Sequence, residues 1–297
     1  MTRVLVAGWF SFEGMGATAG DIISRDLACE WLRSAGHDVD IAVAPPFTGG
    51  VDWRGVEPAD YAQVVFVCGP FGNGWPVAEF LDRFRGCRLA GLNLSMIEPV
   101  EVWNPFDVLI ERDSSRRARP DLTFIAPPAR VPVVGVVLVH PQSEYAGAMH
   151  QEANDAVARL VASRELAAVP VDTRLDVNET GLRTPAEVES LIARMDCVVT
   201  TRLHGMALAI RCGIPPLVID PFAGGRKVQA QAQALGWDVA FTADSLDDER
   251  LSQALDYCLS DAARREAMRV RDRAIRAVER TRDEFVRELA RVMERTV

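Results

Sequence analysis

The stretch Asp196-Cys197-Val198-Val199-Thr200-Thr201-Arg202-Leu203-His204-Gly205 decides how the second half of this chain is expected to fold. The apolar run at its start predicts a short buried strand, and residues 206–211, closed by Gly213, predict a helix. Arg202 and His204 therefore lie at a strand-to-helix turn, where unpaired backbone N–H groups and the helix dipole favour a negative ligand. A fixed cation and an imidazole at such a turn indicate a site for anion chemistry.

A second strand–helix unit follows this turn directly. Residues 214–220 predict another strand, and Lys227 opens a predicted helix that runs to about residue 235. Because consecutive units of this kind form right-handed parallel crossovers, both turns are expected at the carboxyl edge of one sheet. Arg202, His204 and Lys227 can then face one crevice. Lys227 is also the only lysine in the chain, which indicates a need for a compact ammonium there, the alternative being a solvated lysine at a helix start.

The composition is that of a folded protein long enough for two domains, with 297 residues, of which 48% are hydrophobic and 25% charged. The net charge of -9 argues against a surface for nucleic acid or for acidic membranes. The six cysteines include no C-x-x-C pair, so they are expected to be buried thiols in a reducing compartment. Four scattered histidines without an H-x-x-x-H pattern predict no metal site, and no cofactor is expected.

No segment of the sequence predicts export or membrane insertion. The amino-terminal residues 1–8 are too short for the apolar region of a signal peptide and predict a first strand instead. No apolar run approaches the length that is needed to span a bilayer. We therefore expect a cytoplasmic globular protein.

The first half of the chain alternates predicted strands and helices. Strands are expected at 4–7, 39–43, 64–68, 89–95 and 108–110, with a helix at 21–35 that Gly36 ends. Continuous apolar runs of this kind, separated by helices, predict a parallel sheet covered on both faces. The proline-rich stretch 119–132 is the expected linker, which gives an amino-terminal domain of residues 1–125 and a carboxyl-terminal domain of residues 131–297.

The alternation begins again after the linker. Strands are predicted at 133–139 and 166–171, helices at 151–164, 185–195 and 246–259, and a strongly helical tail at 261–297. The fold class is therefore α/β, with two doubly wound, Rossmann-like domains facing a cleft and a terminal helix packing back across their junction. The tail has a narrow apolar stripe, and its many Arg and Glu residues indicate a solvated face. The stripe consists of Ile275, Val278, Phe285, Leu289 and Val292.

Three segments in the second half resemble the signature of the polysaccharide pyruvyl transferase family: 201–205 (TRLHG), 213–215 (GIP) and 227–228 (KV). In the first half, 19–21 (AGD) is similar to the family's Gly-Asp turn, 66–69 (FVCG) to its strand and glycine loop, and 110–115 (IERDSS) to its Arg-acid-Ser segment. The chain departs from the family on this acceptor side, because the usual Asn of the first loop is absent and the Arg-acid-Ser spacing is compressed.

The resemblance implies a GT-B-like fold and transfer of a pyruvyl group from phosphoenolpyruvate, as co-substrate, to hydroxyls of a sugar or glycan-like acceptor, forming a ketal. The first domain would be the acceptor side and the second the donor side. Phosphoenolpyruvate carries a phosphate and a carboxylate, which Arg202 and Lys227 would hold, together with Gly205 at the same turn. His204 would handle the proton, since an imidazole titrates close to neutrality.

Three further residues are candidates with an alternative each. Asp21 is expected to act as a base or to orient an acceptor hydroxyl, or else to serve the first turn of a helix. Arg112 would complete the anion site, or lie on the surface in an arginine-rich run. His140, just past a strand end, is expected to point toward the cleft, or to belong to a turn that Pro141 initiates.

Two other function classes stay open. A nucleotide-sugar glycosyltransferase of GT-B architecture would place the same basic residues beneath a diphosphate, with Glu187 or Asp220 on the ribose. A non-catalytic sugar-binding homologue is the third class. No nucleic-acid partner is expected, and the oligomeric state and the identity of the acceptor are left open by the sequence.

Overall fold

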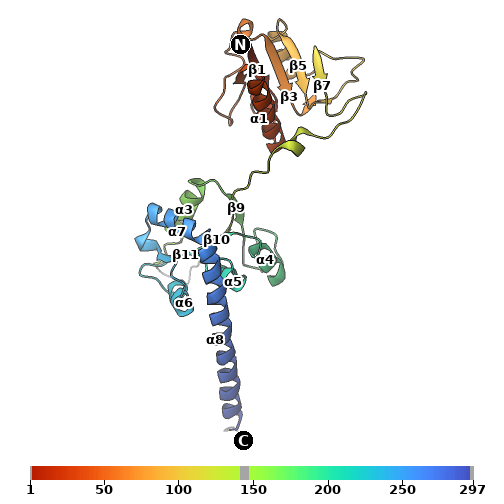
Figure 1. The fold of residues 1–297 in the computed structure, drawn as a ribbon. Helices are drawn as coiled ribbons and strands as arrows, with labels where there is room; N and C mark the ends of the chain where they lie inside the picture. The colour runs from red at the N-terminus through yellow and green to blue at the C-terminus, as the bar shows by residue number, and fades with distance from the viewer. Residues whose placement is uncertain (1, 141–146, 295–297) are drawn as a thin grey trace. The chain divides into compact units, whose positions relative to one another are not determined.

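A computed structural model of the chain describes residues 2–140 and 147–294 (Figure 1). The chain divides into two compact units, Met1–Pro128 and Ala129–Val297, and the division falls within the proline-rich stretch 119–132. Each unit is built around a parallel five-stranded sheet. The expected fold class, two doubly wound Rossmann-like units followed by a terminal helix, is confirmed.

The first unit has the strand order β2-β1-β3-β5-β7. Its strands are β1 (Arg3–Ala7), β2 (Asp38–Ile41), β3 (Gln63–Val67), β5 (Arg88–Leu92) and β7 (Val108–Ile110), with a small second sheet of β4 (Pro70–Phe71) and β6 (Ser95–Met96). Its helices are α1 (Ala19–Ser34) and α2 (Val77–Arg83). Three short 3-10 helices, Trp9–Ser11, Pro58–Asp60 and Leu122–Ile125, lie in its loops.

The second unit has the strand order β12-β11-β10-β8-β9. Its strands are β8 (Val133–Val137), β9 (Ala167–Pro170), β10 (Cys197–Thr200), β11 (Pro216–Asp220) and β12 (Ala240–Thr242). Its helices are α3 (His150–Ala162), α4 (Pro185–Ile192), α5 (Leu203–Arg211), α6 (Lys227–Leu235), α7 (Asp248–Cys258) and α8 (Asp261–Glu294), with a 3-10 helix at Ala243–Ser245.

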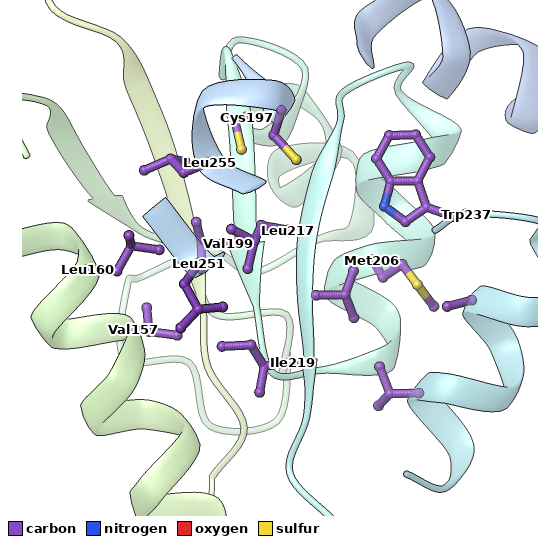
Figure 2. Packing of buried hydrophobic residues seen from close by; sticks show 14 of the residues in the cluster. Val157, Leu160, Cys197, Val199, Met206, Leu217, Ile219, Trp237, Leu251 and Leu255 are labelled. Atoms are coloured by element: carbon purple, nitrogen blue, oxygen red, sulfur yellow. The ribbon is translucent and has the colours of Figure 1, made fainter. Parts of the chain in front are cut away.

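Both faces of the second sheet are buried, as the continuous apolar strands predict. Successive strand residues point to opposite faces, so Cys197 and Val199 join one hydrophobic cluster while Val198 joins another. Figure 2 shows side chains of α3 and α7, among them Leu160 and Leu251, gathered against the β10–β11 face. The same alternation occurs along β1 in the first unit. Helices therefore cover each sheet on both sides, and ligands of such sheets bind at the sheet edges.

The strand order places a crevice at a defined edge of the second sheet. β8 pairs with β9 on one side and with β10 on the other, so the order of the strands reverses between β8 and β10. In an open parallel sheet, ligands bind outside the carboxyl ends of the strands at such a reversal. The residues that follow β8 and β10 include His140 and Arg202.

Several expected boundaries are wrong in an informative way. The helix of the Arg202 turn begins at Leu203, three residues before the expected Met206, so His204 lies inside its first turn. The single strand expected at 89–95 is two strands, because Asn93 adopts a left-handed backbone conformation with φ 58°. The apolar pattern did not predict α2 or β12, which are only seven and three residues long.

The terminal helix α8 packs on its own unit through its first half. It contacts α5, α6 and α7, and its inward residues Ala263, Ala267 and Val270 are fully buried. Its expected packing across the junction stays a prediction. Within the described residues, no helix is both long enough and apolar enough to cross a bilayer.

Gly205 allows α5 to lie directly on the sheet. A Cβ atom at this position would be 2.2 Å from the Thr200 Oγ1 atom and 2.9 Å from a methyl carbon of Val137. Thr200 cannot swing away without loss, because its Oγ1 lies 2.9 Å from the Val137 carbonyl oxygen and accepts a hydrogen bond from the Arg202 N–H. Only glycine fits here, and the fit fixes where α5 begins.

We expect the substitution Gly205→Ala to lower the free energy of unfolding by about 2–3 kcal/mol, because the added carbon overpacks an unyielding site. Urea unfolding followed by circular dichroism measures the loss. The matched control is Gly135→Ala, whose Cβ would lie 3.2 Å from the flexible Met195 side chain and 3.3 Å from a methyl carbon of Val198. Both distances exceed the 2.2 Å at position 205, so this variant should cost less. Equal losses for the two variants would contradict the packing role of Gly205.

Candidate functional site

A pocket of about 230 Å³ opens at the carboxyl edge of the second sheet. Its basic lining consists of Arg202, His204 and Lys227, which come from the turns after β10 and β11. The rest of the lining is mostly apolar and is formed by Val139, Leu203, Pro221 and Phe222, with Thr201. The structure thus brings together the three residues that the sequence predicts as the core of an anion site.

Arg202 is oriented by the buried carboxylate of Asp172. It occupies the cap position of α5 in extended conformation, and its side chain is 17% exposed. Its Nη1 atom donates to Asp172 Oδ1 at 3.2 Å. A guanidinium carries five N–H donors, so one bond to Asp172 orients the group and uses only part of its capacity. Arg202 is therefore positioned to bind an anion in the pocket.

Asp172 also approaches His140. The carboxylate is 5% exposed, and its Oδ2 atom lies 3.5 Å from the His140 Nε2 atom. Burial by itself raises the pKa of Asp172, but backbone N–H groups of Arg174 and Glu179, with the charges of His140 and Arg202, lower it below the ordinary value overall. Asp172 is thus a stable anion that aligns one residue from each of two neighbouring strand ends.

His204 is exposed at the second position of α5, in the first helical turn. The turn before it is rigid, because Thr201 Oγ1 accepts the Val139 N–H at 2.8 Å and lies 3.2 Å from Asn154 Oδ1 on α3. These contacts join the end of β8 to the start of α5. The imidazole therefore stands on a fixed backbone beside the pocket while keeping access to solvent.

Lys227 is the first residue of α6, and its position depends on Asp220. Asp220 is fully buried at the end of β11, and its Oδ2 accepts the N–H groups of Arg226, Val228 and Gln229 at 2.7–3.1 Å. This carboxylate caps α6 and sets the angle at which the helix leaves the loop. The exposed Lys227 side chain is thereby directed to the pocket edge.

Two other predicted residues of this unit have a different relation to the pocket. In the described part of the chain, His140 is not among the residues that line the pocket. It is linked to the pocket residue Arg202 by Asp172, which contacts both side chains. Gly205 is buried against Thr200 and serves packing, and its predicted part in substrate binding stays a prediction. The turn that Pro141 would initiate lies outside the described residues.

Asp21, in the first unit, is a helix-capping acid. It is 7% exposed, and its Oδ2 accepts hydrogen bonds from the Thr18 N–H at 2.7 Å and the Thr18 hydroxyl at 2.8 Å. Together with the reverse bond from its own N–H, these contacts form a capping box at the start of α1. Asp21 therefore serves the first turn of a helix, which was the alternative to a catalytic role. Its role as a base or in orienting an acceptor hydroxyl stays a prediction.

Arg112 lies in a network of acids in the first unit. It pairs with Asp121 at 3.0 Å and Asp113 at 3.1 Å, and it donates to the Ser95 hydroxyl. Burial raises the pKa of Asp121, but hydrogen bonds from Thr123, Asn93 and Arg112 lower it to about 2. Two carboxylates thus already neutralise Arg112, and its predicted part in the anion site stays a prediction.

Sequence reasoning missed Asp172 and Asn154. Asp172 had a usable signal, because it is the first charged residue after the apolar strand run 166–171 and so falls at the carboxyl edge of the sheet. Asn154 had none, since it looks like an ordinary polar position of α3. Within the described residues, no three His, Cys, Asp or Glu side chains gather as metal ligands would.

The two acids considered for a ribose have other partners. Glu187 forms the capping box of α4, where its Oε2 accepts the Thr184 N–H at 3.2 Å and Thr184 caps it in return. Asp220 is buried under α6, as described above. Both carboxylates thus cap helices, and the ribose role considered for them stays a prediction.

Residues 119–221 match the model of the polysaccharide pyruvyl transferase family. The resemblance that the sequence predicts is confirmed over this segment, which includes Asp172, Arg202 and His204 and ends before Lys227. Among curated proteins, tetraacyldisaccharide 4'-kinase of Pseudomonas fluorescens is 36% identical over 80 residues, which are 27% of this chain and 23% of that protein. The match thus spans about a quarter of that relative's length.

Among solved structures, the chain matches the spinosyn forosaminyltransferase SpnP with 12% identity, a TM-score of 0.33, and coverage of 91% of this chain and 94% of that one. The UDP-GlcNAc 2-epimerase of Methanocaldococcus jannaschii has 9% identity and a TM-score of 0.33, with coverage of 88% and 93%. The glycosyltransferase SnogD of Streptomyces nogalater has 14% identity and a TM-score of 0.32, with coverage of 92% and 94%.

We expect Asp172→Asn to lower the free energy of unfolding by about 2–4 kcal/mol at pH 7, because it leaves Arg202 and His140 without their buried counter-charge. The folded-state pKa of Asp172 lies below its ordinary value of 3.8. The stabilisation is therefore present above pH 3.8 and is lost as pH falls through the depressed folded-state value.

Urea unfolding of both proteins between pH 7 and pH 3 measures this difference. The matched control is Asp176→Asn in the same loop, because Asp176 also pairs with an arginine, Arg174, but is 71% exposed. A stability loss at Asp176 as large as that at Asp172 would contradict the role of burial.

Proposed function

We propose that this chain transfers the pyruvyl group of phosphoenolpyruvate to hydroxyls of a sugar or glycan-like acceptor. The observation that carries the proposal is the convergence of Arg202, His204 and Lys227 on one small pocket. Phosphoenolpyruvate has two anionic groups, and the pocket has two cations of different geometry, a guanidinium fork and an ammonium. The family match over residues 119–221 supports the same activity.

The size of the pocket also favours a small donor. Its volume of about 230 Å³ lies below the range of about 300–1,000 Å³ that is typical of sites for drug-sized ligands. A three-carbon phosphate ester suits such a space better than a nucleotide sugar does. The capping roles of Glu187 and Asp220 point the same way, because both carboxylates considered for the ribose of a nucleotide donor already cap helices.

Ketal formation requires three events that these residues suit. A proton is added to the methylene carbon of phosphoenolpyruvate, two acceptor hydroxyls form bonds to the adjacent carbon and lose their protons, and the phosphate leaves as inorganic phosphate. His204, exposed beside the pocket, would carry the proton, which is worth about 10²–10⁴ in rate for a general acid–base group. Arg202 and Lys227 would stabilise the charge that collects on the departing phosphate.

We expect His204→Ala to abolish turnover while leaving the affinity for phosphoenolpyruvate within about threefold, because the imidazole moves a proton and does not hold the donor. Arg202→Ala should weaken phosphoenolpyruvate binding by at least about tenfold, because it removes the fixed cation. Isothermal titration calorimetry measures the affinity, and phosphate release with a panel of sugar diols measures turnover.

The control variant is Arg211→Ala, at the far end of the same helix, where the side chain is 70% exposed and pairs with Glu189. It should change neither quantity. Binding of nucleotide sugars in place of phosphoenolpyruvate would refute the proposal in favour of a glycosyltransferase. Phosphoenolpyruvate binding with no phosphate release from any acceptor would favour a non-catalytic homologue.

A further inference from the structure

The second half of α8 presents a regular apolar stripe to solvent. Ile275, Val278, Phe285 and Leu289 are between 49% and 66% exposed, and Val292, 62% exposed, continues the series. The residues that bury the helix end with Val270, and α8 then runs on beyond α5 (Figure 1). A stripe of this regularity indicates a binding partner, because large contiguous apolar areas are uncommon on the exposed surface of a protein in water.

The spacing of the stripe identifies its geometry. From Ile275 to Val292 the positions are separated alternately by three and four residues, which is the heptad spacing of a coiled-coil seam. The one position in the series that is not apolar is Arg282. A helix that covers a globular core has a broader apolar face with a 3.6-residue period, so this narrow seam is suited to a single partner helix.

We propose that this stripe is the seam of an antiparallel coiled coil between two copies of the chain. An antiparallel two-fold alignment centred between Arg282 and Phe285 places Val278 of one copy opposite Leu289 of the other, and Ile275 opposite Val292. It also places Arg282 opposite Phe285, where a guanidinium gains from the ring face. A parallel alignment instead places Arg282 against Arg282, which is repulsive.

The charge of the segment favours a second copy over other partners. Residues 274–292 carry five arginines and four acids, although the whole chain has a net charge of -9. Five positive and four negative side chains leave the segment a net charge of only +1, so two copies meet with little repulsion. A larger basic excess would be needed to hold an anionic membrane or a nucleic acid. The arginines are 276, 280, 282, 287 and 291, and the acids are 279, 283, 284 and 288.

A groove at the base of the stripe has room for the second helix end. It has a volume of about 640 Å³, and its apolar lining includes Ala207, Ile210 and Leu235 from α5 and α6, together with Ile275 and Val278. In the antiparallel alignment, the carboxyl end of α8 from the second copy lies opposite Ile275 and therefore over this groove. One occupant thus accounts for both the stripe and the groove, twice by symmetry.

The groove also enlarges the contact area between the two copies. The seam from Ile275 to Val292 extends over only about 27 Å of helix. A helix pair of this length is short for a stable dimer, and the two grooves enlarge the contact at both ends toward the area of a specific interface. In this arrangement α8 pairs with a second copy, in place of the packing across the junction that the sequence predicts.

The mass of the full chain in solution tests the pairing. We expect light scattering after size exclusion to give twice the chain mass of 32.6 kDa, and the double variant Val278→Glu/Leu289→Glu to give the single mass. The matched control Ala277→Glu/Ala290→Glu adds the same two charges on the opposite side of α8 and should keep the double mass. Thermal unfolding of the variants shows that each is folded.

Disulfide formation tests the direction. Val278→Cys and Leu289→Cys proteins should cross-link when they are mixed under oxidation, and neither should do so alone, because only the antiparallel alignment brings these two positions together. The unsubstituted chain, whose own cysteines are buried or half-buried, is the background control. Cross-linking of the Val278→Cys protein with itself would overturn the antiparallel alignment.

Three results would overturn the pairing as a whole. The first is a single mass for the unsubstituted chain, and the second is a double mass that survives the two glutamates. The third is adsorption of the monomeric chain to anionic vesicles through the stripe. Loss of thermal stability in a monomeric Val278→Glu/Leu289→Glu variant, relative to an equally monomeric unsubstituted chain, would assign the stripe to packing within one chain.

Discussion

The absence of a side chain at position 205 is the constraint on which the candidate site depends. It lets α5 lie against β8 and β10 at a distance where a Cβ atom would be 2.2 Å from Thr200 Oγ1. Thr200 in turn bonds to the backbone of Val137 and Arg202. The close approach of the Gly205 backbone to the Thr200 and Val137 side chains therefore places the start of the helix, its cap residue and the imidazole in its first turn.

Buried carboxylates orient the basic residues of the pocket from behind. Asp172 aligns Arg202 with His140, and Asp220 caps the helix that begins with Lys227. Asp172 is held in the anionic form by donors and cations around it, and the Oδ2 atom of Asp220 accepts three backbone N–H groups, so each acid costs less than an isolated buried charge. The backbone segments that carry the two cations are thereby fixed, which favours the binding of a small ligand with two anionic groups. Arg112 in the first unit is arranged differently, because two acids pair directly with its guanidinium.

The proposed activity and the proposed pairing use separate parts of the second unit. The pocket lies at the carboxyl edge of β8, β10 and β11, while the apolar stripe occupies the last half of α8. They meet through α5 and α6, since the first residues of both helices line the pocket, while Ala207 and Ile210 of α5 and Leu235 of α6 line the groove beside α8. A second copy seated in that groove would press on the same helix that places Arg202 and His204.

The sequence by itself determined the fold class, because apolar strands alternate with helices that end at glycines, as in a doubly wound sheet. It also determined the pocket's three basic residues, because parallel crossovers bring every strand-to-helix turn to the same edge of the sheet. The sequence also predicted the cap of α4, with Thr184 at its start and Glu187 at its third position, and the structure has this capping box. It did not determine the role of Asp172 or the capping role of Asp220, because an acid after a strand is equally compatible with solvent. Nor did it show that α8 is exposed beyond Val270. An apolar stripe predicts that the helix makes a contact, but it does not indicate which segment or partner makes it. Only the tertiary structure decided these, because burial and the partners of a carboxylate depend on segments far apart in the chain.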